Sequence, residues 1–167
     1  QRNRLFMVAF SIKAFKNGKF DFPSTPAVSP KDLGNFIDFE GVQSDESYYL
    51  PEENRYHKMI NGEAEDKRCI NQLRKILVRE KKPGVCPTLT ANMGLGGHNV
   101  PFIFDAKGLR KLTEYECLWL QGFPKIFAFP EAVGRAKRYM HVGNSVSVPI
   151  TELLAERVRD KILKERL

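Results

Sequence analysis

The chain opens with a block of apolar residues that no polar position interrupts. Residues 5–10 read Leu-Phe-Met-Val-Ala-Phe, a run that predicts a strand buried on both faces. A strand of this kind needs a neighbouring strand on each side, and little else in the chain supplies one. The run therefore indicates that these residues belong to a sheet larger than the one this chain builds alone.

The last part of the chain has the spacing of an amphipathic helix instead. Its apolar side chains share one stripe, formed by Ile150, Leu153, Leu154, Val158 and Ile162. Charged side chains occupy the opposite face, at Glu156, Arg159, Asp160 and Lys164. The pattern predicts a helix over residues 149–167 that packs one face against a neighbour.

Shorter elements are predicted between these two ends. Strands are favoured at residues 76–78 and 100–104, and short helices at 52–61 and 113–120. In the second of these helices, Thr113 is the N-cap and Glu116 stands at the third helical position, which is the arrangement of a capping box.

Charge is distributed unevenly along the 167 residues, whose formal net charge is +7. Residues 1–20 carry five bases and no acid, residues 66–82 carry seven bases and two acids, and residues 38–66 carry nine acids and two bases. A protein that faces DNA on one side has this kind of distribution, because acidic side chains are tolerated on the other side. On charge alone, a solvated surface explains the pattern equally well.

Three cysteines, Cys69, Cys86 and Cys117, stand without any paired spacing. An odd number without a CxxC motif indicates reduced thiols in an intracellular protein, and it argues against a zinc site. No apolar run of the sequence approaches the roughly 20 residues of a membrane helix. We therefore expect a cytoplasmic protein without a metal ion or a membrane partner, in which all three cysteines are structural.

Two arginines, Arg2 and Arg4, precede the first apolar run. Because they are two residues apart, a strand directs both side chains to the same side, where the guanidinium groups can donate hydrogen bonds to a carbonyl or a carboxylate. On this segment alone, an exposed basic strand end is the simpler interpretation.

The middle of the chain contains a threonine- and glycine-rich segment, residues 88–97. Glycines let a backbone approach a DNA groove closely, and small hydroxyl side chains bind phosphates and base edges. Basic residues that precede the segment are candidates for base or phosphate contacts, and they are Arg74, Lys75, Arg79 and Lys81. For any one of these four, a solvated charge is the alternative.

A third segment, residues 143–146, reads Gly-Asn-Ser-Val and stands shortly before the predicted terminal helix. It is interpreted as a glycine-led turn whose Asn and Ser side chains can form hydrogen bonds around a small ligand. Residues 110–113, Arg-Lys-Leu-Thr, and 120–124, Leu-Gln-Gly-Phe-Pro, stand upstream of it. Together with Arg2 and Arg4, these blocks resemble the last motifs of the DNA cytosine-5 methyltransferases.

The resemblance implies a mixed α/β fold. Residues 1–15 would supply a strand of the catalytic domain, 16–112 a β-containing and largely irregular target-recognition domain, 113–140 a helix and hinge, and 141–167 a helix packed on the catalytic domain. The two ends, as neighbours in space, would complete the Rossmann-like domain of an S-adenosylmethionine-dependent methyltransferase. The family usually has Pro and Arg at the positions of Glu114 and Tyr115, a departure that does not change the expected activity class.

The resemblance also implies roles for individual residues. Arg4, with Arg2 beside it, would contact the flipped target cytosine. The pocket of the cofactor S-adenosyl-L-methionine would be closed by Asn144, Ser145 and Val146. The residues that bind DNA would be Thr88, Leu89, Thr90, Arg79, Lys81, Arg74, Lys75, Gly96 and Gly97.

Methylation at carbon 5 of cytosine requires a thiolate that adds to the base, and the family supplies it in a Pro-Cys dipeptide. No Pro-Cys pair occurs in this sequence, in which Cys86 precedes Pro87. We therefore expect the carboxyl-terminal, DNA-recognition and cofactor-closing portion of a bacterial restriction-modification methyltransferase, inactive alone.

The expected partners are double-stranded DNA and an N-terminal catalytic region. That region would belong to the same polypeptide or to a companion subunit; a start at Gln1, inside a motif, favours the first. Residues 78–101 look most like enzymes that act on GGNCC-like sites. The alternative function is a non-catalytic, sequence-specific DNA-binding subunit or module.

Overall fold

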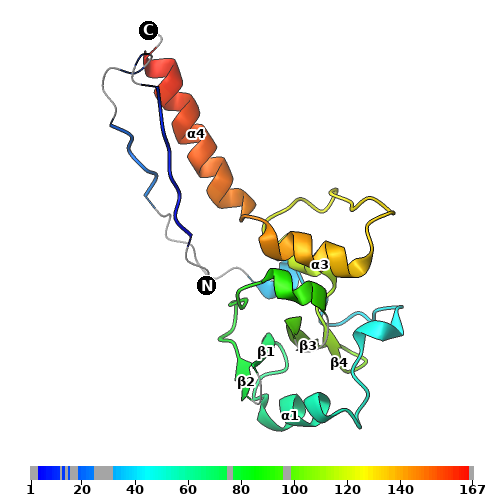
Figure 1. Cartoon of the computed structure of the whole chain (residues 1–167). Helices are drawn as coiled ribbons and strands as arrows, with labels where there is room; N and C mark the ends of the chain where they lie inside the picture. The colour runs from blue at the N-terminus through cyan, green and yellow to red at the C-terminus, as the bar shows by residue number, and fades with distance from the viewer. Residues whose placement is uncertain are drawn as a thin grey trace.

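The computed structural model of the chain describes residues 4–11, 13, 15, 19–24, 32–74, 77–95 and 99–165. Figure 1 shows a body that contains the strands and the first three helices, with the last helix projecting away from it. The described residues form a mixed α/β fold, which confirms the expected fold class.

The strands form a four-stranded antiparallel sheet in the order β2-β1-β3-β4. They are β1 (Asn71–Arg74), β2 (Leu77–Glu80), β3 (Phe102–Phe104) and β4 (Leu109–Lys111). β1 and β2 form one hairpin and β3 and β4 another, and the two hairpins join through a single residue pair, Asn71 with Phe102. The pairing within each hairpin is therefore more extensive than the pairing between the two hairpins.

Leu77 and Val78 of the strand predicted at 76–78 lie in β2, one arm of this first hairpin, where Val78 pairs with Leu73; Ile76 lies outside the described residues. Leu73 is buried and Leu77 is 56% exposed, so one side of the hairpin faces the core and the other faces solvent. The sequence did not predict β4, because its pattern Leu-Arg-Lys carries no apolar alternation. β4 nevertheless buries Arg110 beside Leu109.

The helices lie before, between and after the strands along the chain. They are α1 (Arg55–Glu63), α2 (Glu114–Leu120), α3 (Arg135–Asn144) and α4 (Val148–Glu165), with short 3-10 helices η1 (Leu33–Asn35), η2 (Glu46–Tyr48) and η3 (Ala91–Leu95). α1 begins later than predicted, because the Asn54 side chain accepts a hydrogen bond from the Tyr56 backbone at 2.9 Å and so caps the helix. Among the described helices, none combines the length and the apolarity of a membrane span.

Apolar side chains are buried in two clusters. The larger cluster includes Leu112, Cys117, Leu118, Tyr139, Val142, Leu89 and Met93, which join α2, α3 and η3. The smaller cluster consists of Ile60, Leu73, Phe102, Phe104 and Leu109, beneath α1. Each fully buried aliphatic or aromatic side chain contributes about 1.5–3 kcal/mol. α4 adds no described residue to either cluster, so these clusters fix the body and leave α4 outside it.

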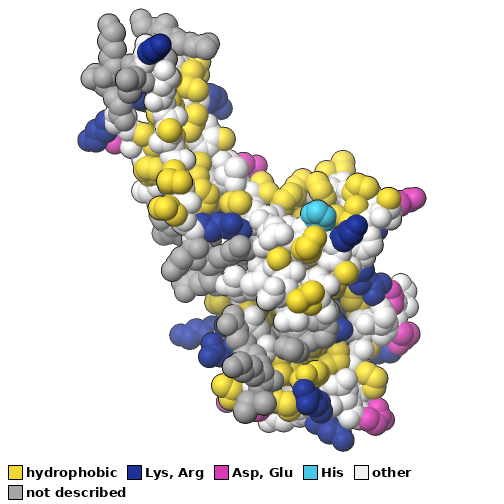
Figure 2. Space-filling view, in the orientation of Figure 1, with side chains coloured by type: hydrophobic (Ala, Val, Ile, Leu, Met, Phe, Trp, Pro, Cys, Tyr) yellow, Lys and Arg dark blue, Asp and Glu magenta, His cyan; other side chains and the backbone are white. Residues whose placement is uncertain are grey.

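The two ends of the chain carry apolar side chains outside these clusters. Residues 4–11 lie in none of the described strands, and the predicted strand is not formed, because no described strand pairs with them. Leu5 and Met7 are 85% and 86% exposed, and Ile150 and Leu163 of α4 are 45% and 54% exposed. Figure 2 shows apolar side chains along the projecting part of the molecule.

Candidate functional site

Arg110, a fully buried arginine on β4, anchors the sheet to the segments around it. Its Nε donates to Asp105 Oδ2 at 2.7 Å, and its two terminal nitrogens donate to the Glu116 carboxylate oxygens at 2.8 Å each. The same two nitrogens reach the backbone carbonyls of Lys111 and Asp38, both at 3.1 Å. All N–H donors of the guanidinium are therefore satisfied, as burial of this charge requires.

The charges of this network stabilise one another. Burial disfavours the charged form of Arg110, but the hydrogen bonds and the charge of Glu116 outweigh it and raise the Arg110 pKa. Burial also opposes ionisation of Asp105, but hydrogen bonds from Tyr49, from backbone N–H groups and from Arg110 lower its pKa. Arg110 and Asp105 therefore stay ionised at neutral pH, and the network ties Tyr49, the residue after η2, to β4 and α2.

α2 carries the predicted capping box and ends against the start of α4. Thr113 Oγ1 accepts from the Glu116 backbone at 3.1 Å, and the Glu116 carboxylate accepts from the Thr113 backbone at 2.7 Å. Gly122 follows with φ +89°, and a Cβ there would lie 2.4 Å from Pro149 Cδ. Only glycine combines this left-handed backbone with so close an approach. The Leu-Gln-Gly-Phe-Pro block thus packs directly against the first turn of α4.

The segment interpreted as a glycine-led turn is instead the end of a helix. Gly143 and Asn144 are the last residues of α3, and Ser145 is its C-cap. The prediction of a turn was wrong because glycine is needed here for packing and not for a bend. A Cβ on Gly143 would lie 2.1 to 2.3 Å from backbone atoms of Thr90 and Ala91.

η3 and α3 also approach each other closely at a second point. Gly94 of η3 approaches the other end of α3, where a Cβ would lie 2.6 Å from the carbonyl oxygen of Ala136. The two backbones therefore touch at both ends of the pair. As a result, the threonine- and glycine-rich segment lies directly against the helix that ends at Asn144.

Arg4 donates a hydrogen bond from its guanidinium group to the backbone carbonyl of Ser145, which is 141 positions away in the sequence. This carbonyl lies at the carboxyl-terminal end of α3, where the helix dipole favours a cation. The bond places the beginning of the first apolar run next to the residues that lead into α4. Arg2 lies outside the described residues.

The three residues expected to close a cofactor pocket differ in exposure. Asn144 is exposed, Ser145 and Val146 are half-buried, and Ser145 Oγ donates to the Val142 carbonyl at 2.7 Å. Within the described part of the chain, the Asn144 amide forms no hydrogen bond. An exposed amide that is free to donate and accept, next to a half-buried apolar side chain, fits a ligand with polar and apolar parts such as S-adenosyl-L-methionine.

The threonine- and glycine-rich segment contributes both core and surface residues. Thr88 and Thr90 are half-buried. Leu89 is only 4% exposed and belongs to the larger cluster, so its side chain packs in the core and does not face a ligand. Gly96 and Gly97 lie outside the described residues.

The basic residues before this segment belong to the first hairpin. Arg79 is exposed on β2, and Lys81 is half-buried just beyond it. The backbone of Arg74 ends β1, where it pairs with Leu77, while Lys75 lies outside the described residues. The hairpin thus presents Arg79 to solvent at the edge of the sheet.

None of the three cysteines has the environment of an activated nucleophile. Burial raises the pKa of Cys69 to about 11 and that of Cys86 to about 12, and it raises the pKa of the fully buried Cys117 well above its usual value. These thiols stay protonated at neutral pH, whereas a nucleophilic cysteine must be a thiolate. Across the described ranges, no group of three His, Cys, Asp or Glu residues is placed to hold a metal ion.

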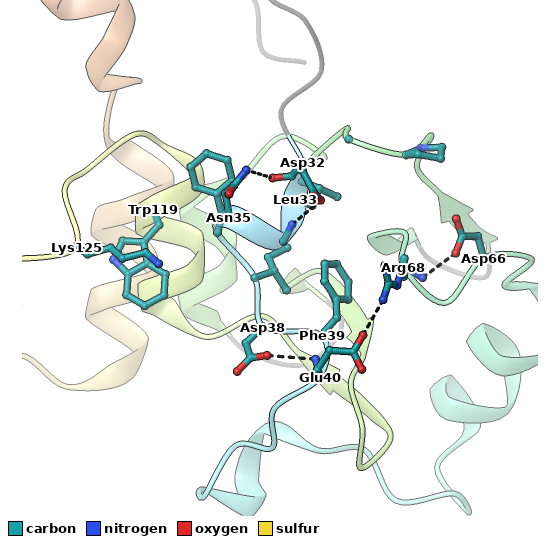
Figure 3. Close-up of a pocket in the computed structure, with 15 residues that line it drawn as sticks. Asp32, Leu33, Asn35, Asp38, Phe39, Glu40, Asp66, Arg68, Trp119 and Lys125 are labelled. Atoms are coloured by element: carbon teal, nitrogen blue, oxygen red, sulfur yellow. Dashed lines mark hydrogen bonds and ion pairs between the residues drawn. The ribbon is translucent and has the colours of Figure 1, made fainter.

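A surface hollow of ≈ 760 Å³ is lined by residues 32–40, by Trp119 of α2 and by residues of the loops nearby. In Figure 3, Arg68 lies between Asp66 and Glu40, and Lys125 lies beside Trp119. Four lining residues are acidic (Asp32, Asp38, Glu40 and Asp66) and two are basic (Arg68 and Lys125). The hollow therefore does not suit a polyanion.

Two further cations, Lys111 and Arg135, were not singled out from the sequence. They line a smaller cavity together with Gly94 and Tyr139. Lys111 stands inside the Arg-Lys-Leu-Thr block and ends β4, but a single basic residue in a sequence gives no sign of what its side chain faces. Arg135 begins α3, a helix that the sequence did not predict.

The chain matches the model of the family of C-5 cytosine-specific DNA methylases over residues 1–160. It is 38% identical to the type II methyltransferase M.Bsp6I of Bacillus sp. (strain RFL6) over 163 residues, which are 97% of this chain and 50% of that protein. It is 30% identical to the type II methyltransferase M.MspI of Moraxella sp over 164 residues, which are 95% of this chain and 34% of that protein.

The chain therefore spans half of one relative and about a third of the other. This coverage is consistent with the expectation that the chain is one portion of a longer enzyme. No solved structure matches it. Because the family match extends over residues 1–160 of 167, the chain belongs to the family of C-5 cytosine-specific DNA methylases.

Proposed function

We propose that this chain is the DNA-recognition and cofactor-closing portion of an enzyme that methylates carbon 5 of cytosine in a specific duplex site, with S-adenosyl-L-methionine as the methyl donor. The observation that carries the proposal is the hydrogen bond from Arg4 to the Ser145 carbonyl. It brings the residue expected to bind the flipped base next to the residues expected to close the cofactor pocket.

The residues on the two sides of this hydrogen bond would bind different reactants. An arginine has five N–H groups, so Arg4 can keep its bond to Ser145 and still donate to the carbonyl oxygen of a cytosine that has left the duplex. Asn144 and Val146 would hold the cofactor through an exposed amide and a half-buried apolar side chain. The cofactor supplies the methyl group when bound, and the residues of this chain bind and orient the two reactants.

In this proposal the nucleophile belongs to a catalytic region outside this chain, on the same polypeptide or a companion subunit. The raised pKa values of the three cysteines support that assignment. The exposed apolar side chains of Leu5 and Met7 and those of α4 would pack on the catalytic region. The expected boundary between residues 140 and 141 falls inside α3, so we assign α3 as a whole to the cofactor-closing part.

A non-catalytic, sequence-specific DNA-binding subunit is the second candidate, and the lack of a Pro-Cys pair in the sequence favours it. The two candidates differ in what the chain does next to a catalytic region. A methyltransferase portion restores methylation when joined to that region, whereas a binding subunit leaves methylation unchanged.

Replacing Arg4 with alanine in the whole enzyme is expected to lower turnover about 10- to 100-fold while DNA affinity changes less than about threefold, because Arg4 acts on the extruded base. Single-turnover methylation and a gel-shift titration measure the two quantities. Arg55→Ala is the matched control, since Arg55 is exposed on α1 and its guanidinium contacts the neighbouring Tyr56. Equal losses of turnover and affinity in Arg4→Ala would identify Arg4 as a phosphate contact instead.

Arg79 is expected to read a base, because it is exposed on the hairpin that precedes the threonine- and glycine-rich segment. Arg79→Ala should cost about 1–3 kcal/mol of discrimination at one position of the site. Binding to a panel of duplexes that vary a GGNCC-type site one base at a time measures this discrimination. Arg79→Lys keeps the charge but loses the forked donor, so it should also relax the preference. A uniform loss on all duplexes would contradict base reading.

A further inference from the structure

A small cavity lies where η2, η3, β4 and α3 meet. It has a volume of ≈ 260 Å³, and its lining includes Ser47, Tyr48, Gly94, Lys111 and Arg135. Pockets for drug-sized ligands occupy about 300–1,000 Å³. The cavity therefore suits one small group and not a whole nucleotide.

Lys111 is half-buried in the wall of this cavity. Burial, together with the nearby charge of Arg135, lowers the Lys111 pKa. In the part of the chain that the structure describes, the Lys111 ammonium forms neither an ion pair nor a hydrogen bond. A half-buried ammonium that faces a second cation without a partner is unfavourable, and a bound anion removes the cost.

Arg135 also lines the cavity and is held there by several contacts. It pairs with Asp45, donates to the Ser47 hydroxyl, and stacks over the Tyr48 ring with 4.4 Å between the guanidinium carbon and the ring centre. Lys111 and Arg135 are the charged residues that line the cavity; Asp45 pairs with Arg135, and Glu114, which accepts a hydrogen bond from Tyr48, pairs with Arg138. The local charge is thus positive by one.

α3 begins at this cavity, since Arg135 is its first residue and Ala136 lines the cavity as well. The N-cap Gly134 provides no side-chain hydrogen bond, so the first N–H groups of α3 have no side-chain cap. The positive end of the helix dipole then adds to the two cations. Gly94, which also lines the cavity and approaches Ala136, leads toward the part of the chain expected to approach DNA.

We propose that Lys111 and Arg135 bind a phosphate group in this cavity, and that in the assembled enzyme it belongs to the DNA backbone beside the threonine- and glycine-rich segment. The inference rests on the proposed function and adds a contact that fixes the protein on the duplex without reading its sequence. The phosphate supplies the negative charge that the cavity lacks. The Ser47 hydroxyl and the first N–H groups of α3 are further donors for its oxygens.

The test measures how the DNA affinity of the whole enzyme depends on salt. Each phosphate contact contributes about 0.9 to the slope of log affinity against log salt. Lys111→Gln should reduce that slope by about 0.9, so the affinity lost between about 50 and about 200 mM salt becomes about threefold smaller. Lys111→Arg, which keeps the charge, should retain the slope. Lys58→Gln is the matched control, because Lys58 is exposed on α1.

A reduced slope that is the same on specific and unrelated duplexes supports the inference. If the slope for Lys111→Gln equals the slope for the control Lys58→Gln, the inference is overturned. If inorganic phosphate stabilises the wild-type enzyme but not Lys111→Gln, while the DNA slope is unchanged, the cavity binds free phosphate and the assignment to DNA is overturned. If the wild-type enzyme does not methylate DNA, the proposed function is wrong. The salt slopes report only on DNA binding and not on turnover, so the two failures can be told apart.

Discussion

Replacing Arg110 with alanine is expected to lower the free energy of unfolding of this chain by about 3–5 kcal/mol. The substitution removes the cation from a site that is 0% exposed and leaves Asp105 and Glu116 without their buried partner. It also leaves the backbone carbonyls of Lys111 and Asp38 without the hydrogen bonds that Arg110 donates to them. The loss should therefore exceed that of a single hydrogen bond several times over.

Urea unfolding of the chain measures this loss through the fluorescence of Trp119, the one tryptophan in the sequence. Arg68→Ala is the matched control, because Arg68 forms an ion pair with Glu40 at the same kind of distance, 2.7 Å, but both side chains are more than three-quarters exposed. It should cost no more than about 1 kcal/mol. Similar losses in the two variants would show that the burial of Arg110 is not what stabilises the fold.

Gly143→Ala is expected to lower the free energy of unfolding by about 3 kcal/mol, at the upper end of overpacking substitutions. The added methyl group would lie 2.1 Å from the Thr90 carbonyl carbon. Because that neighbour is backbone and not the end of a flexible side chain, α3 and η3 must separate to make room. Separation would also move Asn144 away from the threonine- and glycine-rich segment.

The same unfolding experiment tests this prediction, with Gly62→Ala as the control. Gly62 is also inside a helix and is exposed, and a Cβ there would have no neighbour within 4 Å. Since alanine favours helix over glycine by about 1 kcal/mol, Gly62→Ala should be neutral or stabilising. An equally mild effect at Gly143 would mean that the two backbones separate at little cost, contrary to the close packing described above.

Local signals made parts of this fold predictable from the sequence. The capping box of α2 was predicted from Thr113 and Glu116 alone, because both hydrogen bonds join residues three positions apart. α4 was predicted from its apolar stripe, and the structure places it at Val148–Glu165. In both elements the deciding interactions lie within a few residues of each other.

Elements that depend on distant partners were not predictable in this way. β4 was missed because Arg110 is buried only through carboxylates and carbonyls from other segments. α3 was missed because Gly143 resembles a turn residue until Thr90 is known to lie against it. The same holds for the site: Arg4 was a candidate from the sequence, but its contact with Ser145 spans 141 positions and needs the fold.

The single residue pair that joins the first hairpin to the rest of the sheet has an evolutionary consequence. Under the proposed function this hairpin carries the base-reading Arg79, and it can be exchanged between relatives as a unit, provided that the graft keeps the buried Asn71 and the core contacts of Leu73 and Val78. The Arg110 network lies on the other hairpin and remains intact in such an exchange. New target preferences can then arise by shuffling about ten residues of one hairpin while the rest of the scaffold is inherited unchanged.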